Sequence, residues 1–82
     1  MQLEILTPGK SIFSGAVKSV KVPGSKGSFA VLKNHAPIIS ALVGGELKVE
    51  TEADEEMCYE ISGGTVEVRN NHIVVLVESI IE

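Results

Sequence analysis

The stretch "TVEVRNNHIVVLVE" (Thr65–Glu78) contains two strand patterns separated by a pair of asparagines. Val66 and Val68 alternate with polar residues, as in a strand that has one buried face and one wet face. Asn70-Asn71 follows, and asparagine tolerates the positive φ angles that a tight hairpin turn requires. The stretch therefore predicts a β-hairpin.

The second strand of this hairpin is apolar on both faces, because Ile73–Val77 is an uninterrupted apolar run. It is either a central strand that the protein covers on both sides, or a strand with one face kept for a partner subunit. An uncovered apolar strand with no partner would promote aggregation. The burial of this run therefore distinguishes the two interpretations.

Outside this hairpin, glycine, proline and asparagine interrupt the chain at intervals of about eight to twelve residues, which is typical of short strands in a sandwich or barrel. No window has convincing helical periodicity. The acidic stretch "TEADEEM" (Thr51–Met57) is expected to be an exposed hairpin tip. The sequence predicts an all-β fold in a single domain, residues 1–82.

Within "GAVKSVKV" (Gly15–Val22) the alternation changes phase. Val20 and Val22 are in register with each other, but Val17 is not. One extra residue in a strand restores such a register, so a β-bulge is expected near Lys18-Ser19.

The composition excludes several classes of protein. Apolar residues make up 44% of the 82 residues and aromatic residues only 4%, and the net charge is −4. Residues 1–43 carry a charge of +4 and residues 44–82 a charge of −8. A nucleic-acid-binding protein needs a basic surface and aromatic rings on which bases stack, so this chain is not expected to bind nucleic acid. A single cysteine excludes an internal disulfide. No signal peptide or membrane helix is expected, which favours a cytosolic or peripheral protein.

No catalytic or metal site is expected. His35, His72 and Cys58 lack the spacing of a zinc site and are too few to close one. The acidic neighbours of Cys58 do not favour a reactive thiolate. Ser62 in "ISGG" lacks the flanking pattern of a nucleophile elbow.

Three segments carry a family resemblance: "LTPGKSIFSGAVKSVKVPG" (Leu6–Gly24), "VPGSKGSFAVLKNHAPIISAL" (Val22–Leu42) and "ISGGTVEVRNNHIVVLVE" (Ile61–Glu78). In this order and at this separation they resemble the epsilon subunit of F-type ATP synthases. The resemblance implies a flattened β-sandwich of about ten short, mainly antiparallel strands. Typical members continue into a two-helix C-terminal domain, which would begin where this chain ends in "ESIIE". The chain therefore resembles a short member or an N-terminal domain, and neither helix-based inhibition nor nucleotide binding is expected.

The chain departs from the family pattern at Ala30, Lys33 and Asn34, where many members have glycine or a Pro-Gly pair. Asn34 can adopt a left-handed conformation in place of glycine. The turn before His35 is therefore expected to be kept.

The resemblance implies two contact surfaces. One faces the c-ring and consists of Pro23, Gly24, Ser25, Lys26, Gly27, Ser28 and Phe29, with Lys26 paired to acidic or carbonyl groups of the ring. The alternative is a plain hairpin turn, and a phosphate-binding loop is excluded because the P-loop spacing is missing. The other surface faces the shaft subunit and consists of His35, Ala36, Pro37 and Ser40. The alternative for His35 is a ring that caps its own turn by donating to a backbone carbonyl. Pro37 has no N–H, which suits the start of an edge strand.

The function implied is that of a non-catalytic central-stalk rotor subunit, which couples the ion-driven c-ring to the gamma (shaft) subunit without a cofactor. It would lie peripherally on the cytoplasmic side of the bacterial inner membrane. One rival is a lipoyl or biotinyl carrier domain, but Lys48 lies within a strand pattern, and Lys26 and Lys33 lack a flanking methionine. A small all-β binding module is the other rival.

Overall fold

A computed structural model describes residues 1–81. Nine strands and no helix occur among these residues, which confirms the all-β prediction. The strands are β1 (Gln2–Thr7), β2 (Lys10–Val22), β3 (Phe29–Leu32), β4 (Ile38–Leu42), β5 (Gly45–Thr51), β6 (Glu56–Ile61), β7 (Gly64–Arg69), β8 (His72–Val77) and β9 (Ile80–Ile81). None of residues 1–81 belongs to a helix that could span a membrane.

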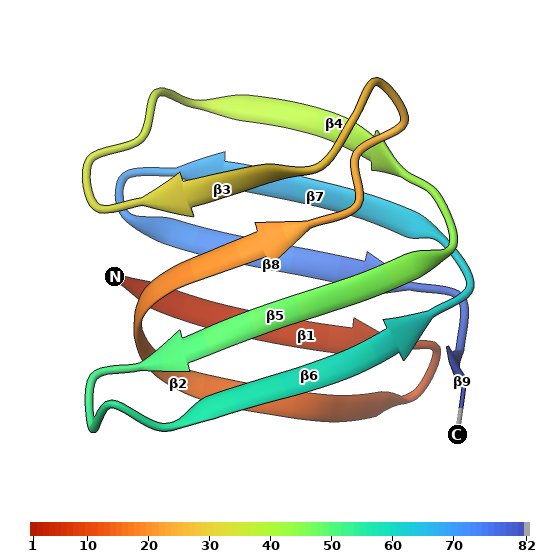
Figure 1. Ribbon diagram of the computed structural model, residues 1–82, viewed down its shortest axis with the longest axis horizontal. Coiled ribbons are helices and arrows are strands. Elements are labelled where there is room, and N and C mark those ends of the chain that lie inside the picture. Colours follow the sequence, from red (N-terminus) through yellow and green to blue (C-terminus); the bar gives the residue numbers. More distant parts are fainter. Residues whose placement is uncertain (82) are drawn as a thin grey trace.

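The strands form one open sheet that folds over into two layers (Figure 1). The hydrogen-bonded order is β4-β7-β8-β1-β2-β5-β6-β9, and β3 pairs with β2. The first layer contains β4, β7, β8, β1 and the first part of β2; the second contains the rest of β2 with β3, β5, β6 and β9. All pairs are antiparallel except β1 with β8, so the expected sandwich of mainly antiparallel strands is confirmed.

A bulge in β2 allows this strand to serve both layers. Val17 pairs with Thr51 and Ser19 with Glu50, so Lys18 is an extra residue on β2. The extra residue leaves Val17 and Val20 fully buried, whereas regular alternation would put one of them outside. The predicted bulge is confirmed. A second shift, between Ile5 and Leu6 of β1, was not predicted.

The core between the layers is entirely aliphatic. It consists of Leu3, Ile5, Val17, Val20, Val22, Val31, Leu42, Leu47, Val49, Ile61, Val66, Val68, Ile73, Val75 and Val77. Burial of one such side chain contributes about 1.5–3 kcal/mol. The aromatic rings of Phe13, Phe29 and Tyr59 pack at the margin of this core, where burial raises the pKa of Tyr59. Close packing of branched side chains makes the body stiff.

The turns follow the sequence patterns. Asn70 and Asn71 have φ angles of 50° and 59°, so the predicted tight hairpin between β7 and β8 is confirmed. The connection between β5 and β6 is an exposed acidic tip, as expected. The Lys18 ammonium donates a hydrogen bond to the carboxylate of Asp54 in this tip, which raises the pKa of Lys18.

A substitution at Gly64 tests the close approach of β7 and β8 in the first layer. A Cβ at this position would lie 2.0 Å from the backbone oxygen of Leu76. Its φ of 157° also disfavours a side chain. Gly64→Ala should therefore lower the free energy of unfolding by about 3 kcal/mol or more, measured by chemical denaturation. Gly44→Ala is the matched control, since its Cβ would make ordinary contacts at 3.5 Å. A Gly64→Ala variant as stable as this control would contradict the described pairing of β7 with β8.

Candidate functional site

The outer side of the first layer carries a group of apolar side chains that the protein itself does not cover. The strand registers place Ile39 next to Glu67, Glu67 next to Val74, and Leu76 next to both Thr65 and Leu6. Ile39 is 76% exposed and Leu76 is 50% exposed. We call the group of Leu6, Ile39, Ala41, Val74 and Leu76 the apolar face.

The burial of β8 decides between the two interpretations of its apolar run. Ile73, Val75 and Val77 are buried, whereas Val74 is half-buried and Leu76 exposed. β8 lies in the middle of its layer, between β7 and β1, but nothing in residues 1–81 covers its outer side. The interpretation as a strand covered on both sides is wrong, and β8 keeps one open apolar face.

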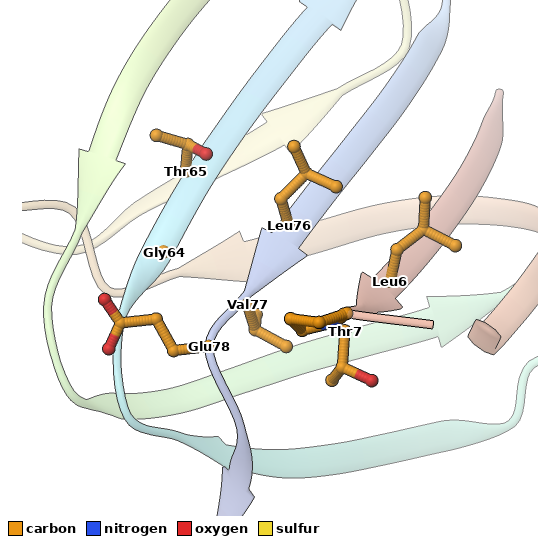
Figure 2. Close-up of a pocket in the computed structure, with 8 residues that line it drawn as sticks. Leu6, Thr7, Gly64, Thr65, Leu76, Val77 and Glu78 are labelled. Atoms are coloured by element: carbon orange, nitrogen blue, oxygen red, sulfur yellow. The ribbon is translucent and has the colours of Figure 1, made fainter. Parts of the chain in front are cut away.

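A groove lies at the end of the apolar face that contains Leu6 and Leu76. Figure 2 shows Leu6 and Leu76 next to each other, on the adjacent parallel strands β1 and β8. Thr65, Gly64 and Glu78 continue the lining, and the volume of the groove is about 540 Å³. The mixture of two leucines with a threonine and a carboxylate suits a protein surface better than a small polar ligand.

The outer side of the second layer is charged along β5 and β6, and its exposed apolar side chains, Leu32 and Ile81, lie on the edge strands β3 and β9. Glu46, Glu50, Glu56 and Glu60 are exposed on β5 and β6, and Lys48 lies between them. The Lys48 ammonium lies 3.3 Å from the Glu56 carboxylate, and this hydrogen bond raises the pKa of Lys48. Such a surface is costly to dehydrate, so the two outer faces differ in their suitability for a protein partner.

The residues predicted to face the shaft do not all point the same way. His35, Ala36 and Pro37 lie in the connection between β3 and β4, and Pro37 precedes the edge strand β4 as expected. Ser40 pairs with buried Val66 and lies on the inner side of β4, so its side chain is directed away from the apolar face.

The ring of His35 makes a local contact. Its Nδ1 donates to the carbonyl of Ala36 at 2.7 Å, and the backbone N–H of His35 donates to the Leu32 carbonyl at 3.1 Å. This is the local capping described as the alternative for His35. The role of His35 at an interface stays a prediction.

Two asparagines fasten the connection that carries His35 to the hairpin of β7 and β8. The backbone N–H of Asn34 donates to Oδ1 of Asn71 at 2.6 Å, and Nδ2 of Asn71 donates to Oδ1 of Asn34 at 3.0 Å. Asn34 has a φ of 65°, which confirms the expected left-handed turn. Both asparagines are visible in the sequence, but their pairing could not be predicted from it, because the two positions are 37 residues apart.

The segment predicted to face the ring, Pro23–Phe29, joins β2 to β3 at the top of Figure 1. Pro23 and Gly24 are buried, and Lys26 is exposed in the middle of the loop. The segment is more than a plain hairpin turn, because Gly24 also forms a β-bridge with Leu42 at the end of β4.

The chemically reactive side chains lie apart. His35, His72 and Cys58 are on different elements, and within residues 1–81 no three His, Cys, Asp or Glu side chains are grouped to hold a metal ion. Cys58 is exposed on β6. Nε2 of His72 lies 3.3 Å from the Glu4 carboxylate at the margin of the apolar face.

Comparison with known proteins identifies relatives of the whole chain. The family model for the ATP synthase delta/epsilon chain β-sandwich domain matches residues 1–82. An ATP synthase epsilon chain of Chlorobaculum tepidum is 41% identical over 78 residues, which cover 95% of this chain and 89% of the relative. An epsilon chain of Dehalococcoides mccartyi is 43% identical over 79 residues, but the match covers only 56% of that protein.

Two solved structures have the same fold. One is the Euglena gracilis mitochondrial ATP synthase (OSCP/F1/c-ring), with a TM-score of 0.86, 23% identity, and coverage of 96% of this chain and 51% of that chain. The other is the central stalk and c-ring of the Tetrahymena thermophila mitochondrial ATP synthase, with a TM-score of 0.83, 20% identity, and coverage of 100% and 66%. In both, this chain spans less than two thirds of the matched chain.

The asparagine pair provides a test of how the turn at His35 is held. Asn71→Gly keeps the positive φ but removes both hydrogen bonds to Asn34, so the free energy of unfolding should fall by about 1 kcal/mol. Asn70→Gly, in the same turn, should change it by less than about 0.5 kcal/mol, because the Asn70 side chain makes no hydrogen bond among the described residues. Equal free energies of unfolding for the two variants would show that the Asn34–Asn71 pair does not stabilise the protein.

Proposed function

The chain belongs to the family of ATP synthase delta/epsilon chain β-sandwich domains, and from this we propose that it is a non-catalytic rotor subunit of the central stalk. In this role it couples rotation of the ion-driven c-ring to the gamma (shaft) subunit. The nucleotide chemistry belongs to other subunits. The chain acts as one domain, bound peripherally through these partners at the cytoplasmic side of the bacterial inner membrane.

The observation that carries the proposal is the difference between the two outer faces. On the first layer Ile39 and Leu76 are exposed beside Glu67. On the second layer, glutamates and Lys48 cover β5 and β6, and the exposed apolar side chains Leu32 and Ile81 lie on the edge strands β3 and β9. Apolar side chains that gain by leaving water are characteristic of the buried centre of an interface. We assign the apolar face to the shaft subunit, with His35, Ala36 and Pro37 at its margin.

The second contact of a coupling subunit lies on the loop Pro23–Phe29. Its exposed residues, including Lys26, stand away from the body at one end of the molecule (Figure 1). We assign this loop to the polar loops of the c-ring. A stiff aliphatic core between the two contacts suits a part that must transmit torque without deforming.

The geometry disfavours a carrier domain. A lipoyl or biotinyl domain needs a lysine at the tip of a hairpin, but the β5–β6 tip is acidic, and Lys48 lies in the middle of β5 next to Glu56. The intact mass of the protein from its source cells tests this rival, because a lipoyl or biotinyl adduct would contradict the rotor proposal.

The assignment of the apolar face predicts the effect of removing its most exposed side chains. The double variant Ile39→Gln/Leu76→Gln should bind purified shaft subunit at least about tenfold more weakly, because each glutamine brings a polar group into the interface. Isothermal titration calorimetry measures the dissociation constant. Ile81→Gln is the control: Ile81 is 52% exposed but lies next to Glu60 of the charged layer. Unchanged binding of the double variant, or an equal loss with Ile81→Gln, would overturn the assignment.

The assignment of the loop predicts a salt-dependent contact. Lys26→Glu should weaken retention of the chain by c-ring-containing membranes, more at low ionic strength than at high, because an exposed charge pair is screened by salt. Sedimentation of membranes at several salt concentrations measures retention. Lys10→Glu makes the same charge change at the first residue of β2, beside the turn from β1, which Figure 1 shows far below the loop. Retention of Lys26→Glu equal to that of Lys10→Glu at every salt concentration would contradict a role for Lys26.

A further inference from the structure

The loop Pro23–Phe29 is tied to β4 by backbone contacts. The N–H of Ser25 donates to the carbonyl of Ala41 at 3.0 Å, and the N–H of Val43 donates to the carbonyl of Pro23 at 2.9 Å. Between these two bonds, Gly24 and Leu42 form an antiparallel bridge. We call this contact between residues 23–25 and 41–43 the loop clasp.

The clasp occupies the outer edge of β4, whose other edge pairs with β7. Backbone groups of a strand alternate in direction, so those of Ile39 point to the same edge as those of Ala41. Pro37, at the next position of this kind, has no N–H. The clasp therefore covers the C-terminal end of this edge, at Ala41 and Val43, and leaves the backbone groups of Ile39 uncovered within the described residues.

The clasp connects the two layers at this end of the sandwich. The covalent ends of the loop are β2 and β3, which pair with each other in the second layer. β4 belongs to the first layer and carries Ile39 and Ala41 of the apolar face. The clasp therefore joins the loop directly to the face.

We propose that the loop clasp is the load path between the ring-facing loop and the shaft-facing apolar face, and that Gly24 is the residue that positions it. This inference rests on the proposed function, since it concerns how the two proposed contacts act together. A displacement of the loop moves β4 through the clasp. β4 passes it to β7, with which it is paired along its whole length from Ile38 to Leu42.

Gly24 is required by close approach rather than by a special φ angle. A Cβ at this position would lie 2.7 Å from the carbonyl oxygen of Gly27 and 2.8 Å from the ring of Phe29. The first neighbour is backbone, so the loop must shift to admit any side chain. The N–H of Gly27 also donates to the carbonyl of Gly24 at 3.0 Å, which closes a turn with Ser25 at its second position.

Two pairs of variants test the clasp. Gly24→Ala displaces the loop, and Gly44→Ala is its control because a Cβ at position 44 makes ordinary contacts. Ser25→Pro removes the N–H that binds Ala41 at a turn position that favours proline. Ser25→Ala loses the same hydroxyl but keeps the N–H, so the difference between these two variants reports the hydrogen bond.

The measurements separate the clasp from the contact with the shaft subunit. Amide hydrogen exchange in the isolated protein should be about tenfold faster at Val43 in Gly24→Ala and Ser25→Pro, with the β8 amides unchanged. Binding to purified shaft subunit should stay within about twofold of wild type. In reconstituted ATP synthase, ions pumped per ATP hydrolysed should fall severalfold for these two variants relative to their controls.

Two results would overturn the load path. The first is unchanged exchange at Val43 in both Gly24→Ala and Ser25→Pro. The second is faster exchange with normal pumping, which would show that the clasp opens without consequence. Failure of the wild-type protein to bind the shaft subunit would instead overturn the proposed function, so the two failures can be told apart.

Discussion

The bulge at Lys18 is the constraint on which the rest of the structure depends. β2 belongs to both layers, and its buried side chains must point inward on each side of the crossing. With Lys18 as the extra residue, Val17 and Val20 are both fully buried. Without it, one of the two valines would face water and β5 would pair one residue out of register, which would turn every side chain of β5 to the opposite side.

The paired layers leave two outer faces with different chemistry. On the charged layer, Lys48 pairs with Glu56. On the other, Ile39 is 76% exposed and Leu76 is 50% exposed. The exposed part of such side chains adds little to the stability of the chain itself, which is consistent with the proposed partner at this face. The loop clasp extends this arrangement, because it fastens the loop of one layer to the strand at the margin of the apolar face.

Local features could be predicted from the sequence, and features that depend on strand register could not. The phase change around Val17 located the bulge, and Asn70-Asn71 located the hairpin, because each depends on neighbouring residues only. The apolar face needs the registers of four strands, which no single segment contains. The side of a strand on which each residue lies could nevertheless be predicted from the sequence. Ile39 and Ser40 are consecutive in β4, so their side chains cannot lie on the same face. The bridge from Gly24 to Leu42 gave no signal, since backbone pairing between distant segments leaves little trace in side chains.

The central claim is that the apolar face is the surface that binds the shaft subunit, and side-chain footprinting tests it most directly. Hydroxyl radicals oxidise exposed aliphatic side chains, so reactivity can be compared residue by residue between the free chain and its complex with purified shaft subunit. The account predicts that Ile39 and Leu76 lose most of their reactivity in the complex, while Ile81 on the charged layer keeps its own. A complex in which Ile39 and Leu76 remain as reactive as in the free chain would contradict it.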